Sequence, residues 1–437
     1  MAHDETDETG GAPKPADSEP VSRRRVLGGA VVAGLAGAAA GAAGGGFAGY
    51  AVGAEQQTGG DNDTVDLRRS YPFYGQGATP QGGIATPPQR YCVFMSFSLA
   101  AGAGRSDLQS LLARWSAAAA VLQQGKPVGA VQPQVEVQPP ADTGEAFGLS
   151  PASLTVTIGL GPSVFGDRFG LTGKRPAKFA DLPAINGDNL DPRLHGGDLS
   201  VQACADDPQV CYHATRNLTR LGRNIVAPFW QVLGFGRASA GPGQATPRNL
   251  MGFKDGTRNV MSDEQYQRFV WVDNADQAWM NGGTYQVARK IRMLLETWDT
   301  DRIGDQQQIF GRTKQDGAPL GGKTEFDTPD FAAKGANGKP VIDPLSHIGL
   351  AARENNDGVM IRRRSYNYTD GLDPTGQLNA GLLFISYQND PQNFVRLQNR
   401  LGANDLLNEY IRHIGSAIFA VPPAPSQGHY LGQSLFS

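Results

Sequence analysis

Alternation of apolar and polar residues predicts β-strands in both halves of the chain. The stretch Tyr91–Leu99, YCVFMSFSL, has the apolar and aromatic density of a buried strand, and Ser153–Gly161, SLTVTIGLG, alternates β-branched with polar residues. In the second half Thr284–Leu295 alternates in the same way, and GVMIRRRSYNY and GLLFISYQND are further strand candidates. Strand-forming sequence therefore recurs in two halves of similar length.

Helical spacing follows these strands in each half. Asp107 can cap a helix whose apolar residues recur every three or four positions: Leu108, Leu111, Leu112 and Trp115. A second helix is predicted beside Pro208 in DDPQVCYHATRNLTRLG, and others near Phe394–Leu401 and Asp405–Ile414. Strands and helices in this order predict an α+β fold, with an antiparallel sheet covered by helices.

Shifts in composition divide the chain into four parts. Residues 1–54 differ from the rest and are treated below, and residues 55–90, rich in Gly, Pro and Gln, predict an extended arm. The two halves of the folded part are predicted to span 91–270 and 271–437. Within the second half, 301–345 is long and polar, and long loops in compact domains are often functional.

The first 54 residues have the parts of a secretory signal. Residues 26–54 carry no charge, follow the three arginines of SRRRVL and end on the small residues of VGA. Arg23 and Arg24 add the twin-arginine feature, although Arg25 blurs which two arginines form the pair. An uncleaved membrane anchor is the alternative, because a spanning helix needs roughly 20 residues. The many glycines favour export instead, to an extracellular, periplasmic or cell-envelope location.

Charge and cysteine content remove several classes of protein from consideration. The chain has 39 basic and 42 acidic residues without basic blocks, so it lacks the electrostatic footprint of a nucleic-acid-binding or membrane-surface protein. Three cysteines do not make a disulfide framework. Cys204 and Cys211 would close a short loop if they paired after export, whereas Cys92 lies in an apolar run typical of a core residue.

The motifs of the commonest active sites are missing from the sequence. It contains no phosphate-binding GxxxxGK[ST] loop, no GxSxG elbow and no HExxH zinc pair. His195, His213 and His413 have settings typical of structural histidines. His347 stands out, because SHIGLAAR follows the long polar loop and precedes Arg364 by 17 positions.

Three consecutive arginines in IRRRSYNY cannot all face solvent on a strand. Side chains alternate between the two faces, so Arg362 and Arg364 share one face and Arg363 takes the other. One face should then point inward, where a guanidinium needs an anionic partner or ligand. A second ambiguous feature is MGFKDGTRNV, residues 251–260, because Asp255 can form a plain Asp-Gly turn or serve as a positioned acid.

Taken together, GFKDGTRN, SHIGLAAR followed by IRRRSYNY, and GLLFISYQND resemble the sequence marks of the dye-decolourising haem peroxidases. The resemblance is strongest to their exported deferrochelatase/peroxidase group and covers essentially the chain after residue 54. It includes GGIATPPQ near the start and Gly197–Leu218, GDLSVQACADDPQVCYHATRNL. It implies two ferredoxin-like α+β halves that form a barrel-like core, with haem b held mainly by the C-terminal half.

The resemblance also implies roles for single residues. Asp255 matches the distal acid/base, Arg364 the distal arginine and His347 the axial ligand of the haem iron. Further positions that it places at the cofactor or close to it are Gly256, Thr257, Arg258 and Asn259, with Asp390 as a carboxylate near the proximal histidine. The loop after His347 departs from the family pattern, because Gly349 replaces a common basic residue and no proline precedes Arg353.

The activity implied is that of an exported haem peroxidase. It would reduce hydrogen peroxide through a ferryl haem and oxidise bulky organic donors such as dyes and phenols. Relays for the electrons are expected among Trp271, Tyr366, Tyr368 and Tyr387. Expected partners are the twin-arginine export machinery, a reductant and a second copy of the chain. Two alternatives stay open: deferrochelatase-like release of iron from haem, and a non-catalytic haem-binding protein of the envelope.

Overall fold

The computed structural model describes residues 65–236 and 246–437, so the predicted signal at 1–54 lies outside the described residues. Among those residues, nine strands form one sheet, and all of its pairings are antiparallel. They belong to the compact unit Gln57–Ser437.

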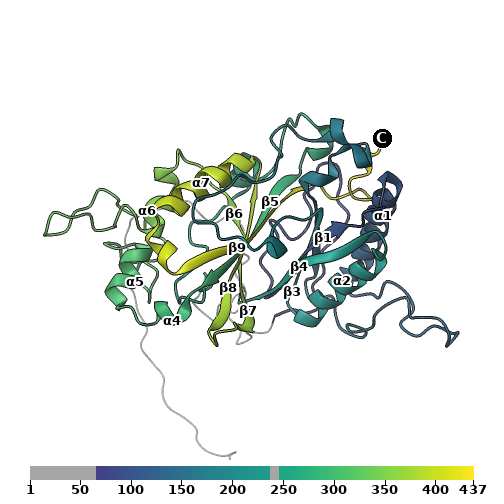
Figure 1. Cartoon of the computed structure of the whole chain (residues 1–437), viewed down its shortest axis with the longest axis horizontal. Helices are drawn as coiled ribbons and strands as arrows, with labels where there is room; N and C mark the ends of the chain where they lie inside the picture. The colour runs from purple at the N-terminus through teal and green to yellow at the C-terminus, as the bar shows by residue number, and fades with distance from the viewer. Residues whose placement is uncertain (1–64, 237–245) are drawn as a thin grey trace, which may run out of the picture. The chain divides into compact units, whose positions relative to one another are not determined.

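The first half of this unit is a ferredoxin-like βαββαβ arrangement. In chain order its elements are β1 (Tyr91–Leu99), α1 (Arg105–Leu122), β2 (Thr155–Leu160), β3 (Leu199–Ala205), α2 (Pro208–Leu221) and β4 (Val226–Phe235). The strands pair in the order β4-β1-β3-β2, and Figure 1 shows α1 and α2 side by side next to this part of the sheet.

The second half repeats the arrangement with insertions. Its elements are α3 (Asp263–Phe269), β5 (Thr284–Met293), α4 (Leu295–Trp298), α5 (Ile303–Phe310), α6 (His347–Ala351), β6 (Arg362–Arg363), β7 (Tyr366–Leu372), β8 (Leu378–Gln388), α7 (Pro391–Asn404) and β9 (Ile411–Val421). Strands β7, β8, β5 and β9 pair in that order, as their counterparts do in the first half, and β6 adds a short edge beside β8. The predicted α+β fold of two ferredoxin-like halves is confirmed.

Two short seams join the halves into a closed ring of eight strands. Strands β4 and β7 pair through Gly234 with Tyr368 and Phe235 with Asn367, and β2 meets β9 where Leu160 pairs with Ala420. Because β5 also pairs with β8, the sheet closes on itself. Side chains that alternate inward meet inside this ring, which we call the ring interior.

Matching Asp-Pro pairs begin the helices that follow β3 and β8. Asp207 caps α2 by accepting hydrogen bonds from the backbone N–H groups of Gln209 and Val210, and Pro208 occupies the first helical position. Asp390 caps α7 in the same way, with Pro391 after it. Proline suits this position because its missing N–H would have no intrahelical partner.

One predicted helix is wrong. The stretch Asp405–Ile414 contains only the short 3-10 turn Leu406–Glu409, and the strand β9 begins at Ile411. IRHIGSAIFAV is rich in β-branched and apolar residues, and its pairing with β5 over the full length of that strand outweighs local helix propensity.

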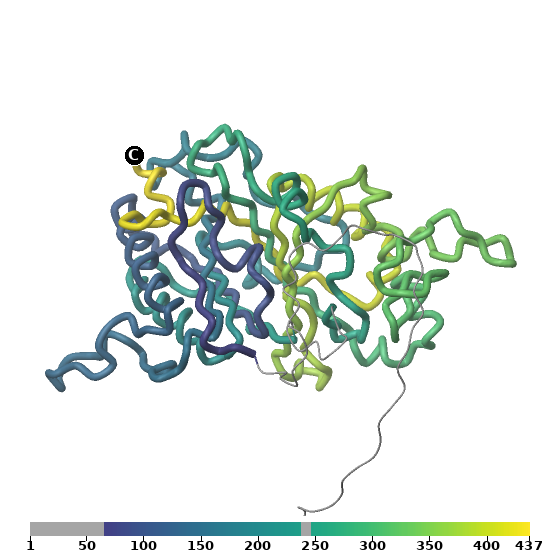
Figure 2. The backbone as a smooth tube through the Cα atoms, turned by 180° about the vertical axis from the view of Figure 1, so that it is seen from behind, coloured from purple at the N-terminus to yellow at the C-terminus, as the bar shows by residue number. Residues whose placement is uncertain are grey.

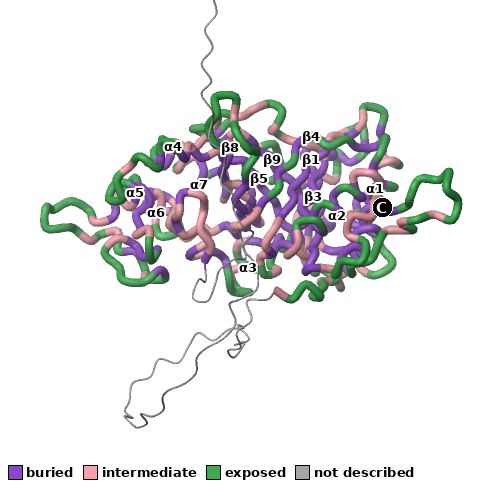
Figure 3. Tube along the Cα trace, turned by 90° about the horizontal axis from the view of Figure 1, so that it is seen from below, coloured by how far each residue is buried: buried purple, intermediate pink, exposed green. Residues whose placement is uncertain are grey.

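Apolar side chains fill three clusters that the sheet separates. One lies between the first half of the sheet and α1 and α2, one in the ring interior and one around Trp298, next to α4 and α5. Figure 3 shows the strands as mostly buried and the exposed residues concentrated in loops. Among the described residues, no helix is both long and apolar enough to cross a membrane.

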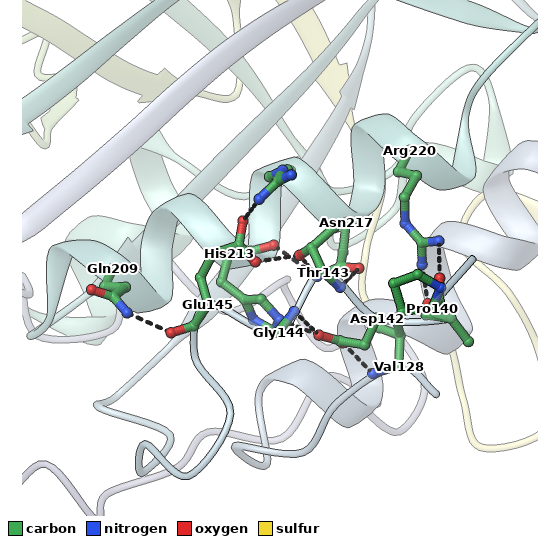
Figure 4. Close-up of polar contacts among 12 residues, drawn as sticks. Val128, Pro140, Asp142, Thr143, Gly144, Glu145, Gln209, His213, Asn217 and Arg220 are labelled. Carbon is green, nitrogen blue, oxygen red and sulfur yellow. Dashed lines mark hydrogen bonds and ion pairs between the residues drawn. The ribbon is translucent and has the colours of Figure 1, made fainter. Parts of the chain in front are cut away.

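Two long loops extend from the unit near residues 126–150 and 320–345, as Figure 2 shows. The first is attached to α2 by a buried polar network (Figure 4). In that network Asp142 lies 2.8 Å from Nε2 of His213 and accepts hydrogen bonds from the backbone N–H groups of Val128 and Gly144. His213 therefore has a structural role, as its sequence setting suggested.

Acid is expected to weaken this attachment through Asp142. Burial raises the pKa of Asp142, but the hydrogen bonds from His213 and the backbone outweigh it, so the pKa is lowered. A lowered pKa stabilises the fold above the unfolded value, about 3.9, and this contribution is lost as the pH falls through the folded value. At pH 7 Asp142→Asn should reduce the free energy of unfolding by about 1–3 kcal/mol.

Urea unfolding at pH 7 and at pH 3 measures both effects. The difference in stability between wild type and Asp142→Asn should shrink at pH 3. Asp191→Asn is the matched control, because Asp191 also has a lowered pKa but forms its ion pair with Arg193 in solvent. Equal differences at both pH values would contradict the role of Asp142.

Candidate active site

A cavity of about 400 Å³ lies against the second half of the sheet. Leu382 and Phe384 of β8 line it, whereas Leu383 and Ile385, which alternate with them, point into the ring interior. Other apolar residues in its wall are Ile291, Met293, Phe394, Leu397, Leu401 and Ile411. The cavity is therefore a largely apolar slot, and the polar side chains that enter it come from a few short segments.

His347 enters the cavity from the first turn of α6. Ser346 caps this helix by accepting a hydrogen bond from the backbone N–H of Gly349. The cap fixes where the helix begins and so places His347 at its first position. Nδ1 of His347 lies 2.7 Å from the Asp405 carboxylate. Since a carboxylate only accepts hydrogen bonds, Nδ1 carries a proton, and in the neutral imidazole Nε2 keeps a free lone pair.

Asp405 holds the imidazole and is itself fixed. Its other carboxylate oxygen accepts a hydrogen bond of 2.9 Å from the backbone N–H of Leu407, so it caps the turn Leu406–Glu409. Burial on its own would lower the pKa of His347, but the charge and hydrogen bond of Asp405 outweigh it and raise the pKa. This pairing makes Nε2 a stronger electron-pair donor, as in metal-bound histidines.

The carboxylate predicted for this role, Asp390, lies elsewhere. It caps α7 and forms an ion pair of 2.8 Å with Lys178. It does not line the cavity. The placement of Asp390 beside His347 is therefore corrected to Asp405, which the chain brings there from 58 residues away.

Asp255 is both a turn residue and a cavity residue. Gly256 has φ +121°, which only glycine adopts readily, and the backbone N–H of Asp255 donates a hydrogen bond of 2.8 Å to Pro247. Its carboxylate lies 3.6 Å from the guanidinium of Arg363, and both residues line the cavity. The turn thus positions the acid, so the two readings of the sequence are compatible.

Arg363, and not Arg364, is the arginine of the cavity. Arg362 and Arg364 are almost fully buried on the opposite face, with exposed fractions of 3% and 0%. Arg364 donates hydrogen bonds to oxygens of Thr86, Pro87 and Gln89. The alternation predicted from the sequence is correct, but the expectation that Arg364 faces the cavity is wrong, because Arg363 lines it and Arg364 does not.

Asn259 fixes the strand that carries Arg363. Its side-chain oxygen accepts a hydrogen bond of 2.9 Å from the Arg363 N–H, and its amide nitrogen donates one of 2.7 Å to the Arg363 carbonyl. The Arg363 guanidinium also donates to the Thr257 carbonyl. Asn259 therefore positions the arginine by holding its backbone on both sides.

Cations gather on one side of the cavity. Arg258, with φ +61°, pairs with Glu354, and the buried Arg312 donates hydrogen bonds to the carbonyls of Gly317 and Glu325. Burial, followed by the charges of Arg258 and Arg363, lowers the pKa of Arg312 to about 10. A ligand with carboxylates would relieve this repulsion.

Most of the predicted residues share this one cavity. It is lined by Asp255, Gly256, Thr257, Arg258, Asn259 and His347. Sequence reasoning missed Arg363, Arg312 and Asp405 as cavity residues, and His413, treated there as structural, also lines the wall. No local motif marks Asp405. The strand alternation, by contrast, placed Arg363 on the face opposite to Arg362 and Arg364, so it made Arg363 one of two candidates for the cavity.

These residues fit haem. Apolar walls suit a porphyrin, the free Nε2 of His347 is a donor that binds haem iron, and the cations Arg258 and Arg312 suit its carboxylates. Among the described residues, no group of three or more His, Cys, Asp and Glu side chains is arranged to hold a bare metal ion.

Comparisons with known proteins agree on one family. The family model of the Dyp-type peroxidase N-terminal domain matches residues 81–236, and that of the C-terminal domain matches 246–426. A dye-decolorizing peroxidase of Thermobifida fusca is 38% identical, over 82% of this chain and 84% of its own. A deferrochelatase of Escherichia coli O157:H7 is 36% identical, over 95% of this chain and 96% of its own.

Solved structures give the same result. An oxyferrous complex of DtpA from Streptomyces lividans has a TM-score of 0.79 and 39% identity, covering 86% of this chain and all of that one. A DyP-type peroxidase from Cellulomonas bogoriensis has a TM-score of 0.77 and 36% identity, covering 85% of this chain and 99% of its own.

Proposed function

Because the chain belongs to the Dyp-type peroxidase family, we propose that Asp255, Arg363 and His347 form its peroxide-reducing site. The protein is a haem-dependent oxidoreductase that uses hydrogen peroxide and an electron donor. The observation that carries the residue assignment is the cavity itself, where the Asp255–Arg363 pair and the Asp405-bound His347 line one apolar slot.

His347 is the residue that would bind the haem iron, through Nε2. Haem, when bound, supplies the iron at which the peroxide oxygen–oxygen bond is broken and through which electrons return. Asp405 keeps the proton of His347 on Nδ1 and so leaves Nε2 for the iron. Arg258 and Arg312 would bind the haem carboxylates by charge.

Asp255 moves the proton that peroxide cleavage requires. Its carboxylate accepts a proton from one peroxide oxygen and returns it to the other, which leaves as water. Arg363, 3.6 Å away, stabilises the negative charge that develops on the departing oxygen. The apolar walls limit the access of bulk water to this exchange.

Replacing Arg363 tests the assignment directly. Arg363→Leu should slow the reaction of the haem-loaded protein with one equivalent of peroxide by about 10²–10³-fold, because a donor to developing negative charge is lost. Stopped-flow absorption of the Soret band measures this rate. Arg364→Met should lower stability but leave the rate of the folded protein near that of wild type. The opposite ranking would return the distal role to Arg364.

Asp405 and Asp390 allow a matched test of the proximal side, because both cap a helical turn. Asp405→Asn should weaken haem binding by roughly 10–100-fold, as expected when the partner of a metal-bound histidine is removed. Asp390→Asn should cost at most about 1 kcal/mol of stability and leave haem affinity unchanged. Titration of the haem-free proteins with haem, followed at the Soret band, measures both. Equal affinities would contradict the role of Asp405.

Two other functions are distinguishable in the same preparations. The similar Escherichia coli proteins are named deferrochelatases, and release of iron from haem would produce free protoporphyrin, which fluoresces. A non-catalytic haem carrier would bind haem and leave its spectrum unchanged by peroxide. The Asp255–Arg363 pair favours the peroxidase, because a carrier needs an axial ligand but no acid beside an arginine.

Export by the twin-arginine pathway is also our proposal. Its support is the Arg23-Arg24 pair before the uncharged residues 26–54. Bulky donors such as dyes and phenols remain the proposed substrates. Fractionation of the producing cells tests the location, since a protein confined to the cytoplasm would contradict export.

A further inference from the structure

Two cysteines face each other in the ring interior, away from the peroxide site. Cys92 of β1 and Cys204 of β3 are directly opposite in the antiparallel register, and both are fully buried. Directly opposite residues have Cα atoms about 4.5–5.5 Å apart, within the roughly 4.4–6.8 Å that a disulfide spans. All three cysteines are free thiols here.

Cys211 does not belong to this pair. It lies on α2 and packs with the cluster between the helices and the sheet, whereas Cys204 points to the other face of β3. The sheet therefore separates them, and the pairing of Cys204 with Cys211 considered from the sequence is replaced by the pairing of Cys204 with Cys92.

A buried cation accompanies the two thiols. Arg364 is fully buried, its hydrogen bonds to Thr86, Pro87 and Gln89 end on neutral oxygens, and its Nε has no hydrogen-bond partner among the described residues. A buried charge of this kind is costly unless an anion is near it. The fold places two acids beside it, the Tyr366 hydroxyl and the Cys204 thiol, and the hydroxyl donates a hydrogen bond of 3.6 Å to the Cys204 sulfur.

The surroundings of Cys204 favour its thiolate. Burial raises the pKa of this thiol, but the hydrogen bond with Cys92 and the charge of Arg364 outweigh burial and bring the pKa to about 6. By contrast, burial holds the pKa of Cys92 well above its usual value. One thiolate and one thiol side by side are the reactants from which a disulfide forms by oxidation.

Two neighbouring arginines, Arg363 and Arg364, connect these thiols to the active site. Arg363 lines the cavity and pairs with Asp255, while its neighbour Arg364 reaches Cys204 in the ring interior. A single peptide unit therefore separates the side chain that faces the peroxide site from the one that contacts the thiols. Tyr366, two residues further on, adds an oxidisable ring in contact with Cys204.

We propose that Cys92 and Cys204 form an internal two-electron donor, which returns the peroxide-oxidised enzyme to its resting state when no external donor is available. The inference rests on the proposed peroxidase function. In the net reaction one S–S bond forms while the two thiol protons and two electrons pass to the peroxide oxygens. Hydrogen peroxide and the dithiol thus give two water molecules and one disulfide.

Thiol counting after peroxide treatment tests the proposal. The haem-loaded protein, without added donor, receives one equivalent of hydrogen peroxide, and its Soret band is followed until it returns to the resting spectrum. The protein is then denatured and alkylated with iodoacetamide, and its mass is measured. Of three alkylated cysteines before treatment we expect one afterwards, with Cys92 and Cys204 joined in the non-reduced peptide map.

Controls separate this outcome from simpler ones. Cys211→Ser should still lose two thiols. Cys92→Ser should form no disulfide, so it should keep both of its remaining thiols and keep the oxidised spectrum longer than wild type. Three intact thiols in wild type after the resting spectrum has returned would overturn the proposal. This result does not depend on whether the variants fold. Equal thiol loss in haem-free protein would overturn it too, because peroxide would then act directly. If peroxide leaves the Soret band unchanged, the proposed function itself fails.

Discussion

Asp255→Asn is expected to slow the reaction with hydrogen peroxide by about 10²–10⁴-fold, the range that a positioned proton-transfer group contributes. An asparagine keeps the size of the side chain and its place in the turn, but it cannot accept and return a proton. Haem binding should be unchanged, because the axial ligand and the cations near Arg312 are untouched. The effect thus separates proton transfer from cofactor binding.

Stopped-flow absorption with one equivalent of peroxide measures this rate, and the Soret absorbance before mixing measures haem content. Asp263→Asn is the matched control, since Asp263 lies in the first turn of α3 and does not line the cavity. A variant at Asp255 that reacts as fast as wild type would show that another group moves the proton. The Asp-Gly pair would then be only a turn.

His347→Ala is expected to abolish stable haem binding. The substitution removes the imidazole that Asp405 orients toward the cavity, so the loss should exceed the roughly 10–100-fold effect of changing Asp405 itself. Without haem the protein should show no peroxidase activity, and added imidazole should restore part of the haem binding by occupying the vacated space.

Haem titration and the haem content of purified protein measure this effect. His413→Ala provides the control, because His413 also lines the cavity but lies 3.3 Å from the amide nitrogen of Gln398. Burial lowers the pKa of His413 to about 3, so this histidine is neutral near pH 7 in the folded wild-type protein. Retention of haem by His347→Ala and its loss by His413→Ala would reverse the assignment.

Features fixed by neighbouring residues could be predicted from the sequence. Asp255 lies in a motif whose glycine has a positive φ, and His347 follows a serine that caps its helix, so local sequence determines how each is presented. The Asp-Pro pairs before α2 and α7 likewise mark helix starts through the cap and the missing N–H.

The errors arose where distant segments meet. Strand alternation placed Arg363 opposite Arg362 and Arg364, but only the closed ring decides which face meets the cavity. Similarly, Asp390 and Asp405 both precede helical turns, and only the path of α7 brings Asp405 to His347. The helix predicted at Asp405–Ile414 failed because β9 gains its stability from pairing with β5.

The sequence by itself therefore determined the class of fold, the family resemblance and two of the three residues proposed for the peroxide site. Only the tertiary structure decided that Arg363 lies beside Asp255, that Asp405 lies beside His347 and that Cys92 lies opposite Cys204. Strand register and ring closure set those contacts. Backbone propensity and capping act within a few residues, whereas the pairing of strands joins residues more than 100 positions apart. A charge or thiol gains its chemistry from such partners, which the local sequence does not contain.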